Sequence, residues 1–149
     1  MLKDNPATQI AWKIRDIHHL HMQNIIGIIE EYGLHTGQPR ILHTIADMNG
    51  TTQTEIANKL KISPASLAVS IKRLQKAGLL EKVTDENDLR VNQIYLTEKG
   101  EKVQSESLAD LIKSDNCLLS GFSLEEIEQL NSSLTRIYTN LKKAEESSC

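Results

Sequence analysis

The chain has 149 residues, a length typical of one ordinary domain, and its 39% hydrophobic and 25% charged residues indicate a soluble globular protein. Its apolar runs are a few residues long, whereas a membrane span needs about 20, so a membrane protein is excluded. The first residues lack the apolar segment of a secretory signal. Two cysteines, Cys117 and Cys149, cannot form a disulfide framework. We therefore expect a cytoplasmic protein.

The net charge of −3 is distributed unevenly along the chain. Residues 1–37 sum to −1, residues 38–100 to +2 and residues 101–149 to −4. The middle third is thus the only basic part. Such an asymmetry favours a segment that faces nucleic acid on a scaffold of different charge, although the excess of +2 is small.

Two helices are predicted within residues 1–50. Apolar residues recur at steps of three and four from Ile10 to Tyr32, which predicts one long amphipathic helix ending near Gly33. A second helix is expected to begin at Gln38-Pro39-Arg40, because proline is tolerated in a first turn. It should end at Asn49-Gly50 with a left-handed cap.

Two short helices follow in close succession. Thr52 and Glu55 have the spacing of a capping box at the start of the first. Ser63 and Pro64 open the second, at about residues 63–78, since serine is a favoured N-cap and proline suits the first helical position. Its inward face is predicted to be Leu67, Ile71 and Leu74. Its outward face is small near the start and basic further along, and comprises Pro64, Ala65, Ser66, Val69, Ser70, Lys72 and Arg73.

The periodicity changes at Leu79. Residues 79–84 and 91–97 have the composition of short strands, and the polar residues 85–90 between them favour a turn. This arrangement predicts a β-hairpin over about residues 79–97 with an exposed tip.

Two more helices are expected after the hairpin. The first starts at Thr97 to Gly100 and is expected to break near Asp115-Asn116. The second starts at another capping box, Ser123 to Glu126, and carries apolar residues at steps of three and four from Leu124 to Leu141. This apolar seam is too short for a free coiled coil, so it should pack against other helices.

Two short helices followed by a hairpin is the element order of a winged helix-turn-helix. A recognition helix hides one face in the core and presents small or hydrogen-bonding residues to the major groove of DNA. Ser66 and Ser70 can contact base edges or phosphates, and Ala65 can contact a thymine methyl group. Lys72 and Arg73 lie where phosphates would pass.

The sequence resembles the multiple-antibiotic-resistance regulator (MarR) family. Residues Thr54 to Leu80 are similar to the helix-turn-helix of that family, Asp88-Leu-Arg90 to its wing motif, and Leu96 to Gly100 to the segment after the wing. Many members carry a basic residue near the middle of the recognition helix, where this sequence has Val69. The wing and the segment after it are the most specific part of the resemblance.

The resemblance implies a mainly α fold with a small β-hairpin wing. A winged helix-turn-helix over residues 38–100 would be flanked by N-terminal (1–37) and C-terminal (101–149) dimerisation helices, in one compact domain overall. The family consists of homodimeric DNA-binding regulators, many of which respond to small anionic or phenolic ligands. The expected function is a ligand-responsive repressor that binds a pseudo-palindromic operator of double-stranded DNA.

The resemblance also implies which residues contact DNA. Asp88 would hold Arg90 through a salt bridge, and Arg90 would enter the minor groove. The expected DNA-binding residues are Ser63, Pro64, Ala65, Ser66, Val69, Ser70, Lys72, Arg73, Asp88 and Arg90. A small-molecule pocket between the dimerisation helices and the winged unit would be lined by Trp12, His21, Tyr32 and His43.

Alternatives come from three other features. His18, His19 and His21 suggest a metal-responsive regulator of the same fold, but neither an HxxxH nor a CxxC spacing occurs, so we expect no metal and no cofactor. Cys117 is expected to be a small hydrophobic residue rather than an oxidant sensor. No glycine-rich phosphate loop or nucleophile elbow occurs, so an enzyme is disfavoured.

A winged-helix module that binds proteins without binding specific DNA is the rival from another class. The acidic net charge suits such a module. It would be expected to expose Leu, Phe or Met on the helix that here carries Ala65, Ser66 and Ser70.

Overall fold

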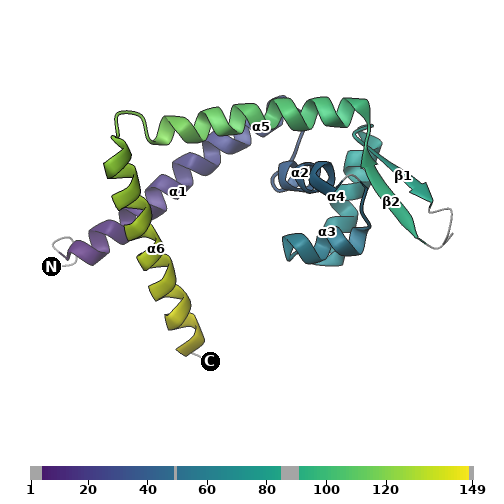
Figure 1. The fold of residues 1–149 in the computed structure, drawn as a ribbon. Helices are drawn as coiled ribbons and strands as arrows, with labels where there is room; N and C mark the ends of the chain where they lie inside the picture. The colour runs from purple at the N-terminus through teal and green to yellow at the C-terminus, as the bar shows by residue number, and fades with distance from the viewer. Residues whose placement is uncertain (1–4, 49, 85–90, 148–149) are drawn as a thin grey trace. The chain divides into compact units, whose positions relative to one another are not determined.

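A computed structural model describes residues 5–48, 50–84 and 91–147. The elements, in chain order, are α1 (Pro6–Glu31), α2 (Gln38–Met48), α3 (Gln53–Leu60), α4 (Pro64–Lys76), β1 (Leu80–Thr84), β2 (Asn92–Leu96), α5 (Glu98–Leu118) and α6 (Leu124–Ser147) (Figure 1). The protein is thus mainly α-helical with one antiparallel hairpin, as predicted. It forms two compact units, Met1–Ser114 and Asp115–Cys149. Among the helices of the described ranges, none is long and apolar enough to cross a membrane.

The two helices in the middle of the first unit begin at the predicted capping residues. The Thr52 hydroxyl accepts a hydrogen bond from the N–H of Glu55 at 3.3 Å, and the Glu55 carboxylate accepts one from the N–H of Thr52 at 2.8 Å. The Ser63 hydroxyl accepts a hydrogen bond from the N–H of Ser66 at 3.2 Å, and Pro64 is the first residue of α4. These bonds satisfy N–H groups that have no partner inside the helix.

The C-terminal helices differ from the prediction at one point. The capping box of α6 is present, since the N–H of Ser123 donates to Glu126 at 2.8 Å and the N–H of Glu126 donates to Ser123 at 3.2 Å. The break expected at Asp115-Asn116 is wrong, because α5 continues through both residues to Leu118. The turn after α5 contains Gly121 at φ +85°, a conformation that glycine adopts without steric cost.

The core of the first unit is aliphatic. The predicted inward residues of α4 are buried among side chains from α1, α2, α3 and the hairpin, and burying each such side chain is worth about 1.5–3 kcal/mol. The buried cluster consists of Ile29, Leu34, Ile41, Leu42, Ile45, Ile56, Ala57, Leu67, Ile71, Leu74, Leu79, Leu80 and Ile94. Because α4 gives one side to this cluster, its other side is free to face a partner.

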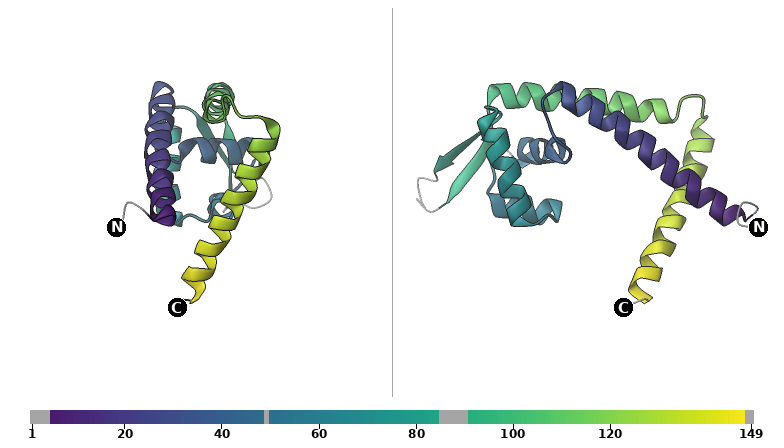
Figure 2. Two further views of the ribbon diagram at one scale, coloured as in Figure 1. Left: turned by 90° about the vertical axis from the view of Figure 1, so that its left-hand side faces the viewer. Right: turned by 180° about the vertical axis from the view of Figure 1, so that it is seen from behind.

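The hairpin is bound at the middle of β2 to the connection between α2 and α3. β1 and β2 pair with Leu80 opposite Leu96 and Thr84 opposite Asn92. Beside them, the N–H of Thr51 donates to Ile94 at 3.3 Å and the N–H of Ile94 donates to Thr51 at 2.8 Å. The right-hand view of Figure 2 shows the hairpin next to α4 and the start of α5.

Two side-chain hydrogen bonds join α1 to α5. The amide of Asn24 donates to the hydroxyl of Ser114 at 2.8 Å, and the hydroxyl of Tyr32 donates to the carboxylate of Asp110 at 2.6 Å. Because the Asp110 carboxylate accepts that hydrogen bond, it stabilises the protonated phenol and raises the pKa of Tyr32 to about 12. The second half of α1 is therefore packed against α5 within the first unit.

Candidate nucleic-acid interface

The predicted recognition helix, α4, displays the residues that the sequence assigns to DNA. Ser70 is half-buried, and the remaining predicted contact residues of α4 and its N-cap are exposed, namely Ser63, Pro64, Ala65, Ser66, Val69, Lys72 and Arg73. Leu67, Ile71 and Leu74 are at most 1% exposed on the opposite side. The helix is therefore amphipathic in the sense that major-groove binding requires.

The hydroxyls at the start of α4 have different tasks. Ser63 caps the helix and its hydroxyl also donates to the Ser66 hydroxyl at 2.8 Å. Ser66 accepts that bond, so its own hydroxyl proton remains available for a base edge or a phosphate. Ser66 is thus the better candidate for DNA contact, and Ser63 a residue that positions it.

The wing residues predicted to enter the minor groove, Asp88 and Arg90, lie outside the described residues. The strands on either side are described as far as the pair formed by Thr84 and Asn92, where the Thr84 hydroxyl donates to the Asn92 side chain at 3.2 Å. The predicted hairpin is confirmed up to this pair.

A groove next to α4 contains a cationic residue that sequence reasoning missed. A cavity of about 200 Å³ lies between the start of α2 and α4 and is lined by Thr36, Gly37 and Arg40 together with Ser66 and Ser70. The sequence signal at residues 38–40 indicated a helix start and did not show that Arg40 lies beside the two serines. Arg40 therefore extends the candidate interface beyond α4.

The four residues predicted to line an effector pocket have separate surroundings in this structure. Trp12 and His21 lie on α1, and Trp12 is 41% exposed. Tyr32 bonds Asp110, whereas the His43 ring lies 3.4 Å from the Gln104 amide and 3.7 Å from Asp47. None of the four lines the groove beside α4. A shared pocket for Trp12, His21, Tyr32 and His43 stays a prediction.

Histidine and cysteine side chains lie mostly at the surface. In residues 5–48, 50–84 and 91–147, no group of three or more His, Cys, Asp or Glu side chains is placed to hold a metal ion. His18 and His19 are exposed on α1, and Cys117 is exposed on α5.

Comparison with known proteins decides the family. The model of the MarR family matches residues 32–90. Over 114 residues, the chain is 30% identical to the uncharacterized HTH-type transcriptional regulator YybA of Bacillus subtilis, and the match covers 76% of each protein. The chain belongs to the MarR family. The family predicted from the helix-turn-helix and wing motifs is confirmed.

Solved structures of MarR-type regulators share the fold. The transcriptional regulator SlyA is 29% identical, with a TM-score of 0.69 over 94% of this chain and 99% of that chain. A mutant of S. aureus MepR, solved bound to an oligodeoxyribonucleotide, is 25% identical, with a TM-score of 0.65 over 89% of this chain and 97% of that chain. The predicted winged helix fold is confirmed.

Proposed function

We propose that this MarR-family protein is a cytoplasmic, homodimeric regulator that represses transcription by binding double-stranded DNA and responds to a small-molecule ligand. The exposed face of α4, made of small, hydroxyl and basic side chains over a buried aliphatic face, is the observation that carries the proposal. The DNA complex of the MepR mutant, a relative of the same fold, supports it. In this proposal α4 enters the major groove and the wing the minor groove.

The residues of α4 divide by the part of DNA that each can contact. Lys72 and Arg73 would bind phosphates and fix the position of the protein on the duplex. Ser66 and Ser70 can hydrogen-bond base edges or phosphates, and the exposed Val69 can contact a thymine methyl group. Asp88 and Arg90 are proposed for the minor groove on the basis of the wing motif.

A second copy of the chain is the proposed partner of the exposed apolar side chains. In α1, Ile10, Ile17 and Leu20 are 52%, 53% and 65% exposed, and in α6, Leu134 and Leu141 are 47% and 66% exposed. Apolar surface gathered on a helix in this way marks an interaction site. We propose that residues 1–37 and 101–149 form the dimer interface, while residues 38–100 bind DNA.

Dimerisation would place two α4 helices on a pseudo-palindromic operator. The two half-sites would be about 34 Å apart, which is one turn of B-DNA. A ligand would act by changing the spacing of the two winged units, and this requires different ligand affinities for the two spacings.

Fluorescence anisotropy on the DNA upstream of the gene for this protein tests the proposal. A scrambled duplex is the sequence control, and both are measured over a range of salt concentrations. Lys72→Ala should weaken binding to both duplexes and lower the salt slope by about one, because one phosphate contact is lost. Lys113→Ala, which changes an exposed lysine of α5 outside the winged unit, is the matched control; because residues 101–149 belong to the proposed dimer interface, it is used only if it sediments like the unmodified protein. Arg90→Ala should weaken binding to the specific duplex.

The outcomes separate the candidate functions. Nanomolar binding that the scrambled duplex lacks supports the proposed regulator. Equal binding to both duplexes contradicts an operator in this DNA. Absence of binding to any duplex at low salt refutes DNA binding and favours the protein-interaction module. For the dimer, sedimentation of Leu134→Glu should give a monomer where the unmodified protein gives a dimer.

A further inference from the structure

The C-terminal end of the recognition helix α4 uses backbone donors for the carbonyls of its last turn. The N–H of Gly78 donates to Gln75 at 2.9 Å, and the N–H of Leu79 donates to Leu74 at 3.0 Å. Gly78 has φ +73°, so the helix ends in a Schellman motif around its C-cap residue, Ala77. The next three carbonyls along the chain, from Ala77 to Leu79, are not part of this motif and need other donors.

The start of α5, which lies beside this end of α4 (Figure 1), supplies a donor to each of the three carbonyls. Thr97 donates twice, from its hydroxyl to Gly78 at 2.7 Å and from its N–H to Leu79 at 3.1 Å. The ammonium of Lys99 donates to Ala77 at 2.8 Å. The Thr97 hydroxyl also accepts a backbone N–H of the first turn of α5 at 3.0 Å. One set of hydrogen bonds therefore completes the end of α4 and the start of α5.

Lys99 differs in role from the lysine that the recognition helix itself displays. Lys72 is exposed on the outward face of α4, where phosphates would pass. Lys99 is also exposed, but its ammonium contacts the C-cap carbonyl of α4, 22 residues earlier in the chain. A cation is favourable at this position, because the C-terminal end of a helix carries a partial negative charge. The ammonium of Lys99 is therefore directed to the protein.

We propose that Lys99 is a positioning residue of the DNA interface: it fixes the C-terminal end of α4 from α5 and does not itself bind DNA. This inference rests on the proposed function, in which α4 enters the major groove. Without the ammonium, the C-cap carbonyl of Ala77 loses its donor and the last turn of α4 is held less firmly. Binding to DNA then has to order that turn, and the cost of this ordering lowers the affinity.

The first arm of the test measures the hydrogen bond by NMR on the full-length protein without DNA. Lys99→Met removes the donor and keeps a long unbranched side chain. The carbonyl carbon resonance of Ala77 should shift in this variant, because its oxygen loses a hydrogen bond. Lys99→Arg keeps a cationic donor and should leave the resonance close to its original position. An unchanged Ala77 resonance in Lys99→Met refutes the contact and with it the proposal.

Lys102→Met is the matched control. It makes the same substitution about one turn further along α5, where the lysine side chain is 74% exposed and its ammonium lies 4.0 Å from the carboxylate of Glu106. The Ala77 resonance should be unchanged in this variant. Because residues 101–149 belong to the proposed dimer interface, the control is used only if it sediments like the unmodified protein. Thermal unfolding establishes that all variants are folded.

The second arm uses the anisotropy assay over a range of salt concentrations. Lys99→Met should weaken binding to the specific duplex by roughly fivefold, the effect of one hydrogen bond, and the salt slope should stay the same. Lys99→Arg should restore the affinity, and Lys102→Met should bind like the unmodified protein. Lys72→Met is the contrasting variant, since loss of a phosphate contact should lower the salt slope by about one.

The outcomes separate the roles that Lys99 can have. A salt slope that falls in Lys99→Met as it does in Lys72→Met assigns Lys99 to a phosphate and refutes the positioning role. Unchanged affinity in Lys99→Met together with a shifted Ala77 resonance shows that the contact serves the fold alone, which also refutes that role. If the unmodified protein binds no duplex, the proposed function and the positioning role fail together, whereas the NMR arm still decides the hydrogen bond.

Discussion

Alanine at position 100 tests the junction between the recognition helix and α5. Gly100 is buried in the first turn of α5, and an added Cβ would lie 2.0 Å from the backbone oxygen of Leu79. That oxygen accepts the N–H of Thr97 at 3.1 Å, and the Thr97 hydroxyl donates to Gly78 at 2.7 Å. Relieving the overlap requires a shift of more than about 1 Å, because ordinary carbon contacts are about 3.5 Å or longer.

The expected cost of Gly100→Ala follows from these contacts. Overpacking costs about 1–3 kcal/mol and each weakened hydrogen bond about 1 kcal/mol, so the free energy of unfolding should fall by about 2–4 kcal/mol. This is a large part of the ~5–15 kcal/mol that stabilises a domain. Gly27→Ala is the matched control, since Gly27 is also helical but nothing lies within 4 Å of its added Cβ. There alanine should stabilise by about 0.5–1 kcal/mol.

Urea unfolding followed by circular dichroism measures both variants. All samples are compared at one protein concentration, because the stability of a dimer depends on it. The two variants should lie about 2.5–5 kcal/mol apart in free energy of unfolding, with the unmodified protein between them. If Gly100→Ala is as stable as Gly27→Ala, the close approach of α5 to Leu79 does not exist in solution.

Three further outcomes are expected. Lys61 ends α3 at φ 53° and is the only non-glycine residue with positive φ among those described. This left-handed conformation strains a residue that has a Cβ, so Lys61→Gly should raise the free energy of unfolding in urea by about 0.5–1 kcal/mol. A loss of stability would contradict backbone strain at this position. The hydrogen bonds from Thr52 hold the pKa of Glu55 below its usual value. Their contribution to stability is therefore complete above the ordinary pKa and is lost as the pH falls from there through the lowered pKa. Glu55→Gln should flatten the acid side of the stability profile, and an unchanged profile would contradict this. The raised pKa of Tyr32 contributes stability that is complete below the ordinary pKa near 10 and is lost as the pH rises toward 12. In a titration followed by phenolate absorbance, Tyr32→Phe should therefore lack the step at the highest pH. Retention of that step would assign it to another tyrosine.

The start of each short helix was predictable because its signal is local. Thr52 and Glu55, like Ser63 and Pro64, bond or precede residues within one turn, so their spacing in the sequence is enough to place the cap. The same local reasoning failed at Asp115-Asn116. These residues are weak helix formers, but tertiary context overrides such preferences, and the helix continues to Leu118.

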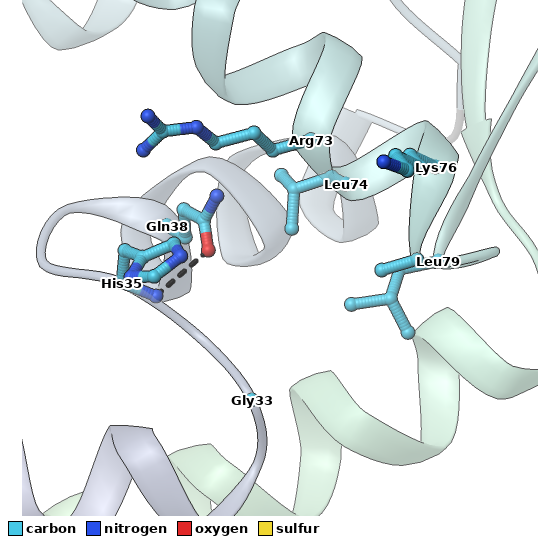
Figure 3. A pocket seen from close by; sticks show the side chains of 8 residues that line it. Gly33, His35, Gln38, Arg73, Leu74, Lys76 and Leu79 are labelled. Atoms are coloured by element: carbon cyan, nitrogen blue, oxygen red, sulfur yellow. Dashed lines mark hydrogen bonds between the residues drawn. The ribbon is translucent and has the colours of Figure 1, made fainter.

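The cavity between the α1–α2 connection and the end of α4 could not be predicted, because its lining residues come from distant segments of the sequence (Figure 3). Gln38 marked a helix start in the sequence, and Arg73 and Lys76 marked a basic helix face. Only the folded chain brings the α1–α2 connection against the end of α4. The burial of Gln38, at 3% exposed, carries no sequence signal, since glutamine is usually a surface residue.

The two hydrogen bonds between α1 and α5 have a consequence during synthesis of the chain. They join Tyr32 to Asp110 and Asn24 to Ser114, residues that are 78 and 90 positions apart. At roughly 5–20 residues per second, a ribosome needs several seconds or more to complete that interval. The helices of the winged unit follow one another closely and can pack as they emerge. The hydrogen-bonding groups of Asn24 and Tyr32 therefore wait for their partners in α5 for several seconds after they are made, although Ile29 of α1 can already join the core with α2 and α4.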